Sequence, residues 1–125
     1  MDVQKQVEYW RSSAEEDLEA ARSLLKKRYL RHALFFAHLA MEKTLKAHVS
    51  RQTEQVPPKI HNLERLAQIA GLALDPNRIS FLRSFDVYQL EGRYPDAVPA
   101  PLDRRTARED FFSAEEMVAW LKTQL

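Results

Sequence analysis

The sequence predicts an all-α fold, an up-and-down four-helix bundle with one short additional helix. Apolar residues recur at helical spacing along most of the 125 residues, and no stretch shows the strict apolar and polar alternation of a half-buried strand. The two glycines and six prolines gather in a few short stretches, which divide the chain into helical segments. These two observations predict several helices packed around one core.

Composition limits the classes of function. With 45% apolar residues, the chain is expected to form a single domain over residues 1–125. The absence of cysteine excludes a disulfide framework, a thiol nucleophile and a Cys-based zinc site, and fits a reducing compartment, so we expect a cytoplasmic protein. No export signal or membrane-spanning run is visible. Because the net charge is only +1, any site for an anion must be local.

Residues 4–28 are predicted to form an amphipathic helix with a basic last turn, antiparallel to the next helix after a tight turn near Tyr29. Asp17 lies inside the apolar stripe of this helix. A carboxylate on a buried face needs a partner or an altered pKa, so Asp17 is either a structural hydrogen-bond acceptor or part of a site. The stripe consists of Val7, Trp10, Ala14, Leu18, Ala21, Leu24 and Leu25.

Residues 29–50 are expected to form the helix around which the others are arranged. Apolar side chains cover more than half of its circumference, so other segments pack on it from more than one side. His48 lies in the middle of the apolar stripe, which favours a core histidine with satisfied hydrogen bonds over a ligand. A narrow polar strip remains, whose two lysines are expected to be solvated unless they bind an anion. The strip consists of His32, Glu42, Lys43 and Lys46, and the spacing of Glu42 and Lys46 suits an ion pair.

The rest of the chain is predicted to contain two more full helices and one short one. Residues 51–62 read as a loop. Asn62 is expected to cap a short helix that stops at Gly71, and Asp75 to cap a long helix that ends at about Glu91, before Gly92. Residues 92–102 contain three prolines and are expected to form a stiff, exposed connection. A last helix runs from about Asp103 to the C-terminus.

Several residues outside the core are candidates for a site. Arg93 lies in the stiff connection, where a loop can present a functional residue from a scaffold. His61 opens the short helix and either bonds to the backbone there or belongs to a site. Arg104, Arg105 and Arg108 oppose the dipole of the last helix, and pairing with nearby carboxylates is favoured over a bridging phosphate. The histidines show no metal-ligand spacing, and no strong catalytic motif is present.

Four motifs occur in a characteristic order: DLEAA at 17–21, ALFFAHLAMEKTLKA at 33–47, HNLERL at 61–66 and GRYPD at 92–96, before a C-terminal helix that contains VAWL. In this order and spacing they resemble the HEPN domain, a small prokaryotic all-α family, over essentially the whole chain. The resemblance implies a helical bundle that is often a homodimer and is frequently encoded beside a minimal nucleotidyltransferase. It also implies either a toxin-like RNase or a nucleotide-binding, non-catalytic partner.

The RNase members of this family carry an Arg followed four to six residues later by a His. Here Arg93 is followed by YPDAVPA, which has no histidine, so an acid/base group worth typically about a hundred- to ten-thousandfold in rate is missing. The resemblance therefore favours a nucleotide- or phosphate-binding partner of a nucleotidyltransferase, as in a toxin-antitoxin pair, with no catalytic residue, cofactor or metal. The residues expected to bind the ligand are Arg93, Tyr94, Asp96, Lys43, Lys46, Glu42, His61 and Asp17.

Two alternatives stay open. The chain is an RNase toxin in which His61 replaces the missing histidine, or it is a structural interaction module in which Arg93 only braces its loop. A homodimer is expected in each case, because a bundle this small leaves side chains such as Phe35 and Leu39 on the rim of its central helix. The expected partners are thus a second copy, a nucleotidyltransferase, and a nucleotide or RNA, with no membrane.

Overall fold

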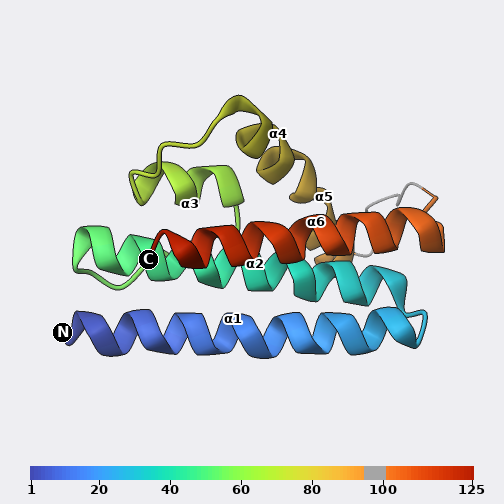
Figure 1. The fold of residues 1–125 in the computed structure, drawn as a ribbon, viewed down its shortest axis with the longest axis horizontal. Coiled ribbons are helices and arrows are strands. Elements are labelled where there is room, and N and C mark those ends of the chain that lie inside the picture. Colours follow the sequence, from blue (N-terminus) through green and yellow to red (C-terminus); the bar gives the residue numbers. More distant parts are fainter. Residues whose placement is uncertain (95–100) are drawn as a thin grey trace.

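The fold is an all-α bundle in the computed structural model, which describes residues 1–94 and 101–125. Helices α1, α2 and α6 lie side by side along the long axis, and α3 and α4 lie over one side of them (Figure 1). No described residue forms a strand, and no described helix is long and apolar enough to cross a membrane. The predicted fold class is confirmed. The helices are α1 (Val3–Lys26), α2 (Leu30–Thr53), α3 (Leu63–Ile69), α4 (Pro76–Phe85), α5 (Val87–Arg93) and α6 (Arg104–Thr123).

Helix α2 is the centre of the bundle, as predicted. It contacts α1, α3, α5 and α6, and its residues from Leu45 to Ser50 are buried without interruption. This continuous burial follows from its small and apolar side chains, which let neighbouring helices approach from several directions. The tight turn that joins α1 to α2 holds Arg28 at a φ of 67°, so the two helices run antiparallel (Figure 1).

The helix boundaries follow the predicted caps. Asn62, Asp75 and Asp103 each accept a hydrogen bond from the backbone N–H three residues later, which satisfies one free donor at the start of α3, α4 and α6. Gly71, the predicted stop of α3, has a φ of 68°. This left-handed conformation costs glycine little because it has no Cβ. The predicted caps at Asn62 and Asp75 and the predicted stop at Gly71 are confirmed, and the last helix begins, as predicted, at about Asp103.

The single long helix predicted for residues 76–91 is wrong, because the chain breaks at Asp86 into α4 and α5. The carboxylate of Asp86 lies 2.8 Å from Nε2 of His38 in α2 and accepts a hydrogen bond from the backbone N–H of Leu63 at 3.3 Å. These two contacts hold Asp86 toward α2 and α3, so the chain does not continue along the axis of α4. The partners come from distant parts of the sequence.

The prediction that the irregular connection begins at Gly92 is also wrong, because Gly92 and Arg93 form the end of α5. A Cβ at position 92 would overlap the ring of Phe35, so glycine lets α5 lie directly against α2. The rest of the predicted connection falls mostly on residues 95–100, which lie outside the described residues.

The polar strip predicted on α2 is not solvated at two of its positions. Glu42 and Lys46 are only 3% and 7% exposed. The predicted ion pair between them forms, with 3.0 Å between Lys46 Nζ and Glu42 Oε2, and the ammonium also lies 5.5 Å from the ring centroid of Trp10 in α1. Helix α1 and the start of α3 therefore cover a strip that periodicity alone assigned to solvent.

His48 is a core histidine, as predicted. It is buried, and its Nε2 lies 2.7 Å from the carbonyl oxygen of Leu121 in α6. Because burial disfavours the charged ring, the pKa of His48 is lowered, although its hydrogen bond to Leu121 opposes this effect. His48 therefore acts as a satisfied polar link between α2 and α6.

Candidate functional site

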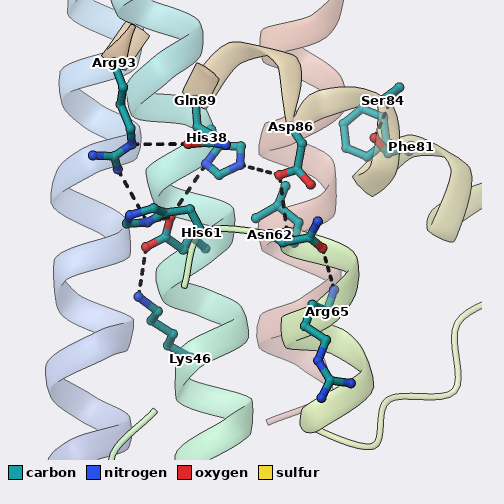
Figure 2. A network of polar contacts seen from close by, with 12 residues as sticks. His38, Lys46, His61, Asn62, Arg65, Phe81, Ser84, Asp86, Gln89 and Arg93 are labelled. Carbon is teal, nitrogen blue, oxygen red and sulfur yellow. Dashed lines mark hydrogen bonds and ion pairs between the residues drawn. The ribbon is translucent and has the colours of Figure 1, made fainter. Parts of the chain in front are cut away.

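A network of polar side chains runs from the core to the surface where α3 and α5 meet α2 (Figure 2). At its centre is the buried carboxylate of Glu42. Its Oε2 accepts a hydrogen bond from Lys46, and its Oε1 lies 3.1 Å from Nδ1 of His61. A buried carboxylate is tolerated when donors surround it, and these two contacts supply them. The network therefore contains a buried ion pair, Glu42 with Lys46, below its surface.

His38 forms the buried end of this network. Its Nε2 faces Asp86, and its Nδ1 lies 3.8 Å from Glu42, which is too long for a hydrogen bond. His38 thereby connects the central helix to the boundary between α4 and α5. Sequence reasoning missed both His38 and Asp86 as members of the network. The available signal was the four-residue spacing of His38 and Glu42, which puts them on one face of α2.

His61 is held over α2 by the start of α3. It precedes the N-cap Asn62, so the turn into the helix directs its ring back toward Glu42. The short contact with a carboxylate makes Nδ1 the donor, and the neutral ring then presents a lone pair at Nε2. That nitrogen has no partner among the described residues, and the side chain is 41% exposed. His61 is thus a carboxylate-oriented imidazole whose second ring nitrogen is open to a ligand.

Arg93 reaches the same place from the end of α5. Its Nη2 lies 3.5 Å from Nδ1 of His61, its Nε donates to Gln89 at 3.2 Å, and its Cζ lies 5.2 Å from the ring centroid of Phe35. Because Nδ1 of His61 already donates to Glu42, the approach of Arg93 is a contact between two donors. Figure 2 shows the guanidinium directed toward His61. Its remaining N–H groups donate to no described residue, so an anion can use them.

An aromatic pocket of about 340 Å³ adjoins Arg93. Phe35 and Phe36 contribute rings that meet edge to face, with centroids 5.9 Å apart. Arg31 and Glu91 form an ion pair at this pocket. A flat, partly polar ligand suits such a lining, because it can stack on a ring and still hydrogen-bond at the edge. The full lining is Arg31, His32, Phe35, Phe36, Glu91 and Gly92.

The predicted ligand residues divide into two groups. Asp17 and Lys43 lie away from the network, in the contact between α1 and α2, where Asp17 Oδ2 and Lys43 Nζ are 2.8 Å apart. Lys43 also donates to Ser13 at 2.7 Å. Asp17 therefore has the structural partner that its position in the stripe required. The predicted residues that the structure brings together are Glu42, Lys46, His61 and Arg93.

The remaining candidates are placed as follows. Tyr94 is the exposed C-cap residue that follows α5, and Asp96 lies outside the described residues. Pairing within α6 is confirmed for Arg105, whose Nε lies 3.1 Å from Glu109. The predicted pairing is wrong for Arg104 and Arg108, whose side chains form no hydrogen bond or ion pair with any described residue. In residues 1–94 and 101–125, no three His, Asp or Glu side chains are grouped to hold a metal ion.

The chain is similar in sequence and in fold to proteins of a known family. The family model of the HEPN domain matches residues 7–124. The crystal structure of TT1696 from Thermus thermophilus is similar, with a TM-score of 0.80 and 26% identity over 96% of this chain and 98% of that chain. ST0689, an archaeal HEPN homologue, has a TM-score of 0.72 and 26% identity over 94% and 96% of the two chains. A search of curated proteins found no match.

Proposed function

We propose that this chain, which belongs to the HEPN domain family, binds a nucleotide where His61 and Arg93 meet and acts as the partner of a minimal nucleotidyltransferase. The observation that supports this proposal is the placement of a guanidinium edge, unpaired among the described residues, beside a carboxylate-oriented imidazole. Two parallel N–H groups of an arginine can bind a phosphate, and the Nε2 lone pair of the neutral His61 ring can accept a hydrogen bond from a hydroxyl or N–H group of the same nucleotide. The buried Glu42 fixes the ring that completes the site.

The aromatic pocket beside Arg93 supports a nucleotide over a bare phosphate. Its volume of about 340 Å³ falls within the range of small-ligand pockets, roughly 300–1,000 Å³. The rings of Phe35 and Phe36 line the pocket, so a base can pack against them there, while Arg93, which lies over the ring of Phe35, reaches the phosphate. Base stacking on an aromatic side chain is worth about 1–3 kcal/mol. The aromatic pocket thus recognises the base of the nucleotide, and Arg93 recognises its phosphate.

A non-catalytic role beside a nucleotidyltransferase is supported by the sequence around Arg93. No histidine occurs in the seven residues that follow Arg93, so this chain lacks the Arg-spacer-His pair of the RNase members that the family resemblance implies. A domain that binds a nucleotide without transforming it needs a second protein to carry out the chemistry. The nucleotidyltransferase that the resemblance also implies would supply this activity.

A homodimer is part of the proposal. Val87, Leu90 and Tyr94 are exposed on or next to α5, and together they leave apolar surface uncovered close to the site. A second copy of the chain would cover it in a symmetric contact. Sedimentation at tens of micromolar protein tests this point, and a monomer under these conditions would contradict it.

Calorimetric titration with a small panel of nucleotides tests the binding site. Arg93→Lys keeps the charge but loses the bidentate hydrogen bonds to a phosphate, so we expect weaker nucleotide binding with little change in stability. His61→Gln should also weaken binding. Arg83→Lys is the matched control, because Arg83 is an exposed arginine that pairs with Glu64 on the α3–α4 side and should leave affinity unchanged. If the wild-type protein binds no nucleotide of the panel, the proposal fails.

An RNase activity is the second candidate, and one observation favours it. His61 is 32 residues away from Arg93 in sequence, yet the fold places its ring at the guanidinium, with Nε2 unpartnered among the described residues. An imidazole can move a proton near neutral pH, so His61 could activate a ribose 2′-OH while Arg93 stabilises the phosphate. Cleavage of RNA in the presence of EDTA, lost in His61→Gln, would support this candidate. Nucleotide binding without cleavage would support the non-catalytic role.

A further inference from the structure

A basic groove lies between the last turns of α1 and the first turns of α6, at the end of the bundle away from both termini (Figure 1). It consists of two adjoining hollows of about 530 and 380 Å³, which share Arg104, Arg108 and Phe112. None of its lining residues belongs to the network around Glu42 or to the aromatic pocket. The cations of the basic groove are Arg22, Lys26, Arg104, Arg105 and Arg108.

Charge is concentrated in this groove. The whole chain has a net charge of +1, whereas five cations and one carboxylate, that of Glu109, line the groove. Arg22 pairs with Glu115 at its edge, and the pair between Arg105 and Glu109 is largely solvated, with 89% of the Arg105 side chain exposed. Such an exposed pair contributes little. The residues that line the groove therefore carry an excess of positive charge, whereas the chain as a whole is nearly neutral.

Three of these cations are unpaired within the part of the chain that the structure describes. The side chains of Lys26, Arg104 and Arg108 make no hydrogen bond or ion pair with any described residue. Arg104 also lies in the first turn of α6, at the positive end of the helix dipole, where a cation is unfavourable. An arrangement that costs stability and satisfies no charge of the described chain points to an external anion.

Phe112 identifies the kind of anion. Its side chain is 48% exposed between these arginines, although its neighbour Phe111 is fully buried. The two rings meet edge to face with centroids 5.7 Å apart, so the buried ring helps to fix the exposed one on a long helix. A fixed aromatic face next to cations matches the way proteins bind single-stranded nucleic acid, where bases stack and phosphates follow the positive charge. An acidic peptide would leave this ring without a role.

We propose that the basic groove binds a single strand of RNA, with phosphates on Lys26, Arg104 and Arg108 and a base stacked on Phe112. The strand must be unpaired, because a base inside a duplex does not offer its face to a side chain. Binding depends on backbone charge and stacking, so it has little sequence preference. The proposal is independent of the nucleotide site at His61 and Arg93.

Fluorescence anisotropy of a short labelled oligouridine, titrated with the full chain, tests this groove. We expect the double variant Arg104→Glu and Arg108→Glu to bind about tenfold more weakly or worse, with a shallower dependence on salt. The matched control is Arg65→Glu with Arg83→Glu, which reverses two exposed arginines on α3 and α4 and should bind as wild type. An equal loss of affinity in both double variants would overturn the proposal. Non-specific electrostatic attraction between the RNA and the whole protein would then explain the binding.

Two further measurements separate the ligand classes. Phe112→Leu should weaken binding about fivefold or more if a base stacks there, and unchanged affinity would overturn the assignment to nucleic acid. An RNA duplex should compete poorly with the single strand, and equal competition would also overturn it. The double variant Arg104→Glu and Arg108→Glu should leave mononucleotide affinity unchanged in calorimetric titration, because neither residue lines the site at His61 and Arg93, so the groove and the nucleotide site are tested separately. Thermal melting should show no loss of stability in Arg104→Glu with Arg108→Glu, because acidic residues suit the start of a helix.

Discussion

Oδ1 of Asp86 lies 2.8 Å from Nε2 of the fully buried His38 and accepts a second hydrogen bond from the N–H of Leu63. One carboxylate thus connects α2, the start of α3 and the boundary of α4 and α5. Since Arg93 is at the far end of α5, this contact also helps to place the guanidinium at the site. A residue in the core therefore supports a residue at the surface.

Removing this acceptor should destabilise the fold. Asp86→Ala leaves the ring nitrogen of His38 buried without its partner, which we expect to cost about 1–3 kcal/mol in the free energy of unfolding. Asp86→Asn retains an oxygen acceptor and should cost less. Urea denaturation of both variants measures the difference. If Asp86→Ala unfolds at the same urea concentration as wild type, the contact does not stabilise the fold.

The pair of Asp17 and Lys43 should be coupled energetically. Both side chains are largely removed from solvent, so Asp17→Ala leaves an ammonium with only Ser13 as a partner among the described residues and should cost about 1–3 kcal/mol. Lys43→Met should cost a similar amount. In the double variant the two losses should not add, because the same contact is removed once. Additive losses in a double-mutant cycle would show that the two charges act independently.

Gly92→Ala tests the close contact of α5 with α2. In an unobstructed helix, alanine is more favourable than glycine by about 1 kcal/mol. Here the new methyl group would overlap the ring of Phe35, so we expect the melting temperature to fall. In a Phe35→Ala background the obstruction is gone, and the same substitution should raise the melting temperature. A rise in the wild-type background would contradict the close packing of Gly92.

The free energy of unfolding should decrease in acid, partly because the pKa of His48 is lowered in the folded state. Its pKa is lowered in the folded state by burial, so as pH falls below the ordinary value near 6.5 the unfolded chain takes up this proton first. The free energy of unfolding therefore decreases from about pH 7 toward about pH 5. In His48→Gln this component is absent, and the decrease over the same range should be smaller. Denaturation at several pH values measures both slopes, and equal slopes would contradict the prediction.

Local patterns in the sequence were sufficient to predict much of the fold. The caps at Asn62 and Asp75 and the stop at Gly71 depend on residues within one helical turn of each other, so they could be predicted without knowing the tertiary structure. The same holds for the central position of α2, since an apolar surface over most of a helix requires neighbours on several sides. His48 was predicted correctly for this reason too.

The break at Asp86 and the network around Glu42 were decided by the tertiary structure. Nothing near Asp86 in the sequence interrupts a helix, and the partners that turn the chain there, His38 and Leu63, are 48 and 23 residues away. Likewise, periodicity placed Glu42 and Lys46 on a polar strip and favoured a solvated Lys46, because periodicity describes one helix at a time and does not show which neighbour will cover it. Coverage by α1 and the start of α3 made that strip a buried network.

The sequence by itself determined that this chain is an all-α bundle with a central second helix, and it named Glu42, His61 and Arg93 as candidates. Only the tertiary structure decided that these three meet. The physical reason is that helix formation depends on contacts between residues three or four apart, whereas a site depends on packing between segments distant in the chain. Arg93 and His61 are 32 residues apart, and their contact exists only because Asp86 and Gly92 set the path of α5 against α2.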